Sequence, residues 1–228
     1  MSRRKTNPTR STRANRSPQD SKRIRNVWLS LVAAMTAVGG GLLLVDSKPA
    51  GAAGMSLMPA VSFTTGSAGL EPVFSKLEAP LVAGRWKAIV IHHSAKPAGS
   101  GAAMDEDFRR AGMSSLGHHF VIGNGRGGME PGELYVGYRW TAQQAGAHAK
   151  GPKADWHNQN AISICLIGDG DRKEFDDKQM QSTAELVTAL CKRLDIPTKN
   201  VILHRDIAKV TDPGRTFPEA WLREQIGR

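Results

Sequence analysis

Residues 27–45 form a run of nineteen residues without a charged side chain, and this run separates a leader from the rest of the chain. About 18 or more uncharged apolar residues are enough to cross a bilayer as a helix. Arg23 and Arg25 lie just before the run, and positive charge there keeps the N-terminus cytoplasmic. We expect a signal peptide or a membrane anchor over 27–45. The following part would then lie in the cell envelope, periplasmic or otherwise extracytoplasmic, anchored in the inner membrane or secreted.

Most of the net charge lies in the leader. The 228 residues include 31 Lys and Arg against 21 Asp and Glu, a formal charge of +10. Residues 1–26 hold nine basic residues and one acid, whereas the remaining 202 residues hold 22 basic and 20 acidic ones. A basic tail on a nearly neutral domain argues against a nucleic-acid-reading surface on the fold. We expect a cytoplasmic tail and no nucleic acid partner; salt-sensitive DNA binding by the tail is the alternative.

The remainder predicts a linker and one domain. Residues 46–84 are rich in Gly, Ala, Ser and Pro without a sustained period, which indicates a linker. From residue 85 to 228, strand and helix signals alternate, so we expect a single α/β domain with a central mixed β-sheet flanked by helices. The clearest helix is 177–194, with Asp176 or Asp177 as its N-cap. The other expected strands are 87–93, 118–123, 133–138, 161–167 and 201–203, and the other helices are 105–112 and 218–226.

A glycine-rich segment, 123–128, matches the G-x-G-x-x-G pattern of dinucleotide-binding proteins. That fingerprint requires a helix to begin at the glycines, because the pyrophosphate lies on the helix N-terminus. Here a second strand follows. We therefore expect a hairpin loop and no nucleotide site.

Three histidines lie at the ends of predicted strands, and one aspartate lies beside a predicted turn. His92 and His93 end one strand, so alternation directs one side chain to each face, and His204 ends another. Asp212 precedes a Pro-Gly turn that would hold its carboxylate still. Two imidazoles and a carboxylate, with a fourth position left to water, make a catalytic zinc site. Spacing alone leaves a second reading open, in which each histidine is an ordinary core or surface residue.

Several segments in a fixed order carry a family resemblance. They are 89–95 (IVIHHSA), 116–125 (LGHHFVIGNG), 146–150 (GAHAK), 162–168 (ISICLIG), 203–206 (LHRD) and 211–214 (TDPG). Together they resemble the zinc-dependent N-acetylmuramoyl-L-alanine amidases, which include peptidoglycan recognition proteins and phage-type amidase lysozymes, over about residues 86–226. The resemblance implies Zn²⁺ as cofactor and peptidoglycan or a muropeptide as partner. It also implies hydrolysis of the amide bond between N-acetylmuramic acid and L-alanine. We expect a monomer.

The same resemblance assigns the site residues. It makes His92, His204 and Asp212 the zinc ligands, with Asp212 where many relatives have Cys and others have Asp. His148 matches a groove residue that contacts substrate, and a plain surface histidine is its alternative. We also assign His119 and His93 to substrate binding, with packing or support of the metal site as the alternative for His93.

Two departures from the family bear on catalysis. Most active relatives have Tyr where this chain has His118, which would stabilise the oxyanion and protonate the leaving amine. Relatives often have Lys at the position of Val210, so Lys209, one residue earlier, is the second candidate donor; Thr211 is another polar group nearby. Cys165 stands where some relatives carry a catalytic Glu, and it reads as a small buried hydrophobe. These departures leave a non-catalytic peptidoglycan-binding module as the alternative function.

Overall fold

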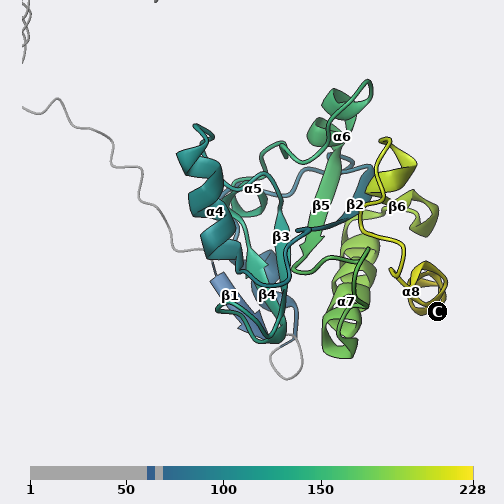
Figure 1. Ribbon diagram of the computed structural model, residues 1–228. Coiled ribbons are helices and arrows are strands. Elements are labelled where there is room, and N and C mark those ends of the chain that lie inside the picture. Colours follow the sequence, from purple (N-terminus) through teal and green to yellow (C-terminus); the bar gives the residue numbers. More distant parts are fainter. Residues whose placement is uncertain (1–60, 65–68, 228) are drawn as a thin grey trace, which may run out of the picture. The chain divides into compact units, whose positions relative to one another are not determined.

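The computed structural model describes residues 61–64 and 69–227 of the chain (Figure 1). The predicted tail over 1–26 and the apolar segment over 27–45 lie outside the described residues. Within the described part, no helix has both the length and the apolar character that a membrane crossing needs.

A six-stranded mixed sheet forms the centre of the domain, in the order β1-β4-β3-β5-β2-β6. Strands β3, β5, β2 and β6 run parallel to one another, and β4 is antiparallel to its neighbours β3 and β1. All residues of β5 are buried, as expected for a strand covered on both faces. The predicted mixed α/β sheet is confirmed. The strands are β1 (Val61–Thr64), β2 (Ala88–His93), β3 (Phe120–Asn124), β4 (Pro131–Val136), β5 (Ala161–Leu166) and β6 (Val201–Leu203).

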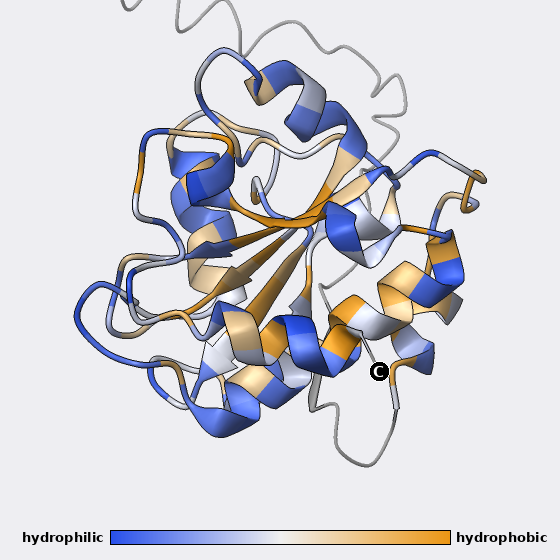
Figure 2. Cartoon of the chain, turned by 90° about the vertical axis from the view of Figure 1, so that its right-hand side faces the viewer, coloured by the Kyte–Doolittle hydropathy of each residue, from blue (hydrophilic) through white to orange (hydrophobic). Residues whose placement is uncertain are grey.

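Helices cover both faces of the sheet. One face packs against α7 and α8 through alternate strand residues such as Ile91, Ile122 and Ile164. The intervening residues, including Val121 and Cys165, pack with α4 on the opposite face. Figure 2 shows hydrophobic residues concentrated on the strands at the centre, whereas the surrounding helices carry both hydrophilic and hydrophobic residues. The helices are α3 (Glu71–Ser75), α4 (Gly101–Arg110), α5 (Tyr138–Thr141), α6 (Ala154–Asn160), α7 (Asp177–Leu194) and α8 (Glu219–Ile226), with short 3-10 turns η1 (Thr198–Asn200) and η2 (His204–Asp206).

Helix boundaries follow their caps. Helix α7 has the predicted bounds, because Oδ1 of Asp176 accepts a hydrogen bond from the backbone N–H of Lys178 at 3.0 Å. Helix α4 begins four residues before the expected start, because the Ser100 hydroxyl accepts from the N–H of Ala103 at 3.2 Å. The helix begins with Gly and Ala after this serine, and these small residues show no apolar period that would identify the start of the helix in the sequence.

The folded domain starts earlier than the sequence predicts. The range expected to be a linker, 46–84, contains β1, which pairs with β4, and helix α3. Val73 of α3 is 1% exposed, and its carbonyl accepts a hydrogen bond from the Trp140 indole at 2.7 Å. Strand pairing, core packing and hydrogen bonds to distant residues hold this segment, and these long-range contacts produce no periodic pattern in the sequence. The hairpin interpretation of residues 123–128 is correct, since they join β3 to β4.

Candidate active site

Strand alternation places His92 on the face of the sheet that α4 covers. It pairs in register with Cys165 of the central strand β5, and its side chain is buried. His204 begins η2, directly after β6, the strand on the other side of β2. The sequence therefore brings two imidazoles to neighbouring strands from positions more than 100 residues apart.

Asp212 joins the two histidines. Its Oδ2 lies 3.0 Å from Nδ1 of His92 and 2.7 Å from Nδ1 of His204. Its Oδ1 accepts a hydrogen bond from the backbone N–H of His93 at 2.6 Å. One carboxylate oxygen is thus fixed by the backbone, while the other faces both imidazoles. Ligand atoms of His92, His204 and Asp212 all lie within 4.8 Å of one another.

Backbone hydrogen bonds hold the Asp212 loop against the His204 turn. The N–H of Arg205 donates to the carbonyl of Asp212 at 2.8 Å, and the N–H of Gly214 donates to the carbonyl of Thr211 at 2.6 Å. The Thr211 hydroxyl donates to the Asp171 carboxylate. The geometry of the cluster therefore depends on three loops, which follow β5, β6 and η2.

The electrostatics favour a charged Asp212 carboxylate beside a neutral His92 ring. Burial alone would raise the pKa of Asp212, but hydrogen bonds from His204, His92 and the backbone of His93 hold it well below its ordinary value. Burial lowers the pKa of His92, although the hydrogen bond to Asp212 opposes this shift. At neutral pH, Asp212 therefore offers an anionic oxygen and His92 a neutral nitrogen, which are the forms that bind a metal ion.

His148 contacts the second ring nitrogen of His92. Its Nδ1 lies 3.0 Å from Nε2 of His92, and burial holds the pKa of His148 well below its ordinary value. Asn158 of α6 fixes the loop, because its side-chain oxygen accepts from the backbone N–H groups of His148 and Ala149, each at 2.9 Å. The structure therefore places His148 beside a candidate ligand, as well as in the loop where the sequence expects a substrate contact.

His118 lies beside the same cluster. Its ring centroid is 5.1 Å from that of His92, and its Nδ1 is 2.6 Å from the hydroxyl of Ser163 on β5. The pKa of His118 lies well below its ordinary value. Burial is the largest cause, and the neighbouring His92 is the second. A neutral ring can donate one hydrogen bond at pH 7, but it does not carry the extra proton of an imidazolium.

His119 and His93 contact backbone groups. The His119 ring is fully buried, with Nδ1 accepting from the N–H of Ser163 and Nε2 donating to the carbonyl of Gln144, each at 3.0 Å. Burial lowers its pKa to about 3. Nδ1 of His93 accepts from the N–H of Gly170 at 3.0 Å. Both nitrogens of His119 are occupied, so in this structure its ring has none to offer a substrate.

The Lys209 side chain is exposed and lies outside the cavity at the cluster. Val210 lines that cavity and is 46% exposed. Cys165 is fully buried in the α4-side cluster, and burial raises the pKa of its thiol, as expected for a packing residue. Among these positions the structure supplies no ammonium group at the cluster.

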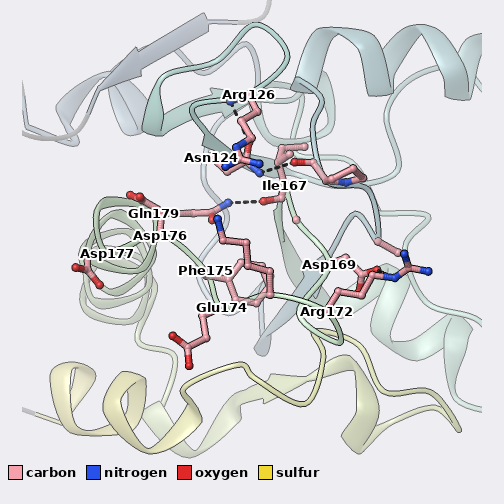
Figure 3. Close-up of a pocket in the computed structure, with 14 residues that line it drawn as sticks. Asn124, Arg126, Ile167, Asp169, Arg172, Glu174, Phe175, Asp176, Asp177 and Gln179 are labelled. Atoms are coloured by element: carbon pink, nitrogen blue, oxygen red, sulfur yellow. Dashed lines mark hydrogen bonds and ion pairs between the residues drawn. The ribbon is translucent and has the colours of Figure 1, made fainter.

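Two cavities meet beside the cluster. One, of about 500 Å³, is lined by His93, Ala95, Asp169, Asp171, Arg172, His204, Val210, Thr211 and Asp212. The other, of about 570 Å³, shares Ala95, Asp169 and Arg172 with the first and continues toward Asn124 and Arg126. Figure 3 shows its wall, where Gln179 donates a hydrogen bond to the carbonyl of Ile167 at 2.8 Å. The three shared residues place the second cavity next to the one at the cluster.

The donor set suits zinc. Two imidazole nitrogens and one carboxylate oxygen are ligands that Zn²⁺ takes, and three protein ligands leave a fourth position for water or substrate. Magnesium and calcium prefer sites made of oxygen atoms alone. The chemistry of these residues therefore fits the cofactor that the sequence predicts.

A mixed α/β sheet that gathers two imidazoles and a carboxylate beside an open cavity is typical of metal-dependent hydrolases. A family model described as N-acetylmuramoyl-L-alanine amidase (Amidase_2) matches residues 83–215, and the chain belongs to this family. The endolysin of Enterobacteria phage T3 is 28% identical over 150 residues, which are 61% of this chain and 88% of the endolysin.

Solved amidase structures from Clostridium intestinale show the same fold. The N-acetylmuramoyl-L-alanine amidase LysC from Clostridium intestinale matches with a TM-score of 0.52 and 23% identity, over 66% of this chain and 96% of that one. Wild-type Drosophila PGRP-LB matches with a TM-score of 0.48 and 25% identity, over 61% of this chain and 82% of that one. The resemblance predicted from the sequence is confirmed at the level of the family.

Two residues at the site, Ser163 and Asn158, are not predicted from the sequence as site residues. Ser163 bonds to His118 from 45 residues away, and Asn158 bonds to the backbone of the His148 loop. Serine in a buried strand and asparagine in a short helix carry no motif of their own. Only the parallel pairing of β3 with β5 and the return of α6 onto the loop bring them to the site.

Proposed function

We propose that the chain is a zinc-dependent amidase that cleaves the bond between N-acetylmuramic acid and L-alanine in peptidoglycan or muropeptides. The convergence of His92, His204 and Asp212, in a chain of the amidase family, is the observation that carries this proposal. When bound at these side chains, Zn²⁺ would polarise the scissile carbonyl and lower the pKa of a water molecule toward 7.

The other histidines and Lys209 are assigned roles relative to the three candidate zinc ligands. The neutral His118 ring donates a hydrogen bond to the developing oxyanion. The lowered pKa of His118 does not prevent this, because a neutral ring keeps one N–H group. The proton for the leaving amine comes from elsewhere, since His118 does not store an extra proton at pH 7. The exposed Lys209 side chain does not line the cavity at the cluster, so we assign it no contact with the reacting atoms. His93 and His119 position the loops and the strand end.

Metal removal and one ligand substitution test this proposal. The purified chain should release free amino groups of L-alanine from peptidoglycan, a chelator should stop the release, and added zinc should restore it. His204→Ala should lose both the bound zinc and the activity, because only two protein ligands remain. His157→Ala is the matched control, since His157 is also buried but bonds to the carbonyl of Lys153 within its own helix.

A binding module that recognises peptidoglycan without cutting it is the second candidate. Val210 at the cavity wall favours it, because a valine side chain cannot stabilise an oxyanion. Retention of muropeptides by the zinc-loaded chain, with no release of amino groups, would establish this function and overturn the first.

We also propose that the domain acts outside the cytoplasm as a monomer. The basic tail and the apolar segment 27–45 support an N-terminal contact with the membrane, and the family's substrate lies in the cell wall. Cell fractionation with an antibody against the domain should find it in the envelope or the medium. Recovery in the cytoplasm, or salt-sensitive DNA binding that residues 1–26 confer, would contradict this placement.

A further inference from the structure

The hydroxyl of Ser163 has one hydrogen-bond partner in the described part of the chain, the Nδ1 atom of His118, at 2.6 Å. Ser163 lies on the central strand and is fully buried. Its backbone is also fixed, because its N–H donates to His119 and its carbonyl accepts from the N–H of His119 at 3.1 Å. The hydroxyl is therefore held rigidly against one nitrogen of the ring next to the candidate metal centre.

This contact has only one arrangement that satisfies both groups. If Nδ1 carried the proton, the serine oxygen would accept it, and the hydroxyl hydrogen would be buried without an acceptor. If the serine donates, Nδ1 accepts and the ring proton lies on Nε2. A buried polar hydrogen without a partner is costly, so the second arrangement is the stable one. No described residue bonds to Nε2 of His118, and this nitrogen is not sealed from solvent.

We propose that Ser163 is a positioning residue that fixes the tautomer of His118 with its proton on Nε2, so that the ring presents a hydrogen-bond donor to the reacting carbonyl oxygen. The ring lies beside two other imidazoles, with its centroid 5.1 Å from that of His92 and 6.2 Å from that of His148. A donor on this ring would therefore lie next to the candidate metal ligand His92. The catalytic part of this inference rests on the proposed amidase function, whereas the tautomer itself does not.

The tautomer can be read directly. Nitrogen NMR of the ¹⁵N-histidine-labelled, zinc-loaded chain should show His118 with a protonated Nε2 and an accepting Nδ1, the resonances being assigned by their loss in His118→Tyr. In Ser163→Ala the accepting Nδ1 signature should be lost. In that variant kcat should fall about tenfold with KM unchanged, as expected for the loss of one hydrogen bond of ordinary strength. Ser163→Thr, which keeps the hydroxyl, should restore both.

Ser115→Ala is the matched control, because Ser115 is equally buried but its hydroxyl has no partner among the described residues. It should keep the wild-type spectrum and kcat. A wild-type ring protonated on Nδ1 would overturn the proposal. So would a Ser163→Ala variant with an unchanged tautomer signature, whatever its kcat, because the serine would then act through packing alone. If the wild-type chain has no activity, the proposed function fails while the NMR spectrum still decides the tautomer.

Discussion

The buried His92 ring uses both of its nitrogens. Nδ1 faces Asp212 at 3.0 Å, and Nε2 faces Nδ1 of His148 at the same distance. A metal ion on Nδ1 requires the ring proton to lie on Nε2, and His148 is then its acceptor. A histidine ligand held in this way by an outer hydrogen bond keeps both its tautomer and its orientation. We therefore predict that His148 supports the candidate metal ligand His92, a role separate from any contact with substrate.

His148→Ala should weaken zinc binding by about 10- to 100-fold, the usual cost of removing an outer hydrogen-bond partner of a ligand. Competition with a chromophoric chelator measures the zinc Kd of the intact chain. His157→Ala again serves as control, because this buried histidine bonds within α6. An unchanged Kd in His148→Ala would leave His148 as a substrate contact only.

At the scale of elements, the loops at the site are held by close backbone contacts. Gly214 has φ +106°, and a Cβ atom there would lie 2.1 Å from the carbonyl carbon of Gly170. The N–H of Thr216 donates to the carbonyl of Gly170 at 2.9 Å. The loop carrying Asp212 therefore packs directly on the loop that follows β5, and this contact helps set the position of the carboxylate.

Gly214→Ala should destabilise the fold and lower zinc affinity together. Gly112 also has a positive φ, +85°, but a Cβ there would meet nothing within 4 Å. Both substitutions place alanine at a positive φ, so the difference between them reports the clash alone. The loss in free energy of unfolding should be about 1 to 3 kcal/mol larger for Gly214→Ala than for Gly112→Ala, the usual cost of overpacking. Urea unfolding of both variants measures the difference. Equal losses of unfolding free energy in the two variants would show that the two loops are not in close contact at Gly214.

The elements themselves were predictable to different degrees. Helix α7 and strand β6 have the predicted bounds, because a full amphipathic period and a short apolar run identify them. Helix α3 and strand β1 were not found, because their few residues are fixed by long-range partners. The three candidate ligands could be proposed because each lies at a strand end or beside a turn and because the family resemblance assigns them. The Ser163 contact could not, because it depends on the register between two strands.

At the scale of the whole molecule, the domain holds several histidines neutral in its interior. Burial is the largest cause of the lowered pKa at each of the four: His92, His118, His119 and His148. Three of them surround the candidate metal centre. The fourth, His119, lies behind it and makes an edge-to-face contact with Trp86, with ring centroids 4.8 Å apart. The arrangement that prepares neutral nitrogen for a metal ion therefore also makes the fold sensitive to acid.

The sign of this sensitivity follows from proton linkage. Below about pH 6.5 the unfolded chain binds a proton at each histidine, whereas folded His119 stays neutral until its pKa of about 3. The free energy of unfolding should therefore fall as the pH drops from about 6.5 toward 3, by up to about 1.4 kcal/mol per pH unit for each such group. His119→Gln removes one of these groups, so its stability should fall less steeply over this range.

Urea unfolding of the wild type and His119→Gln, with a chelator present, at pH 7, 5.5 and 4.5 measures the two slopes. The variant starts from a lower stability, because it loses the ring contacts to Ser163 and Gln144. The difference in stability between the two proteins should narrow as the pH falls. Only the wild type loses the stability that comes from protonation of His119 in the unfolded chain. Parallel curves would contradict this, and would mean that the buried ring takes up its proton in the folded state as readily as in the unfolded one.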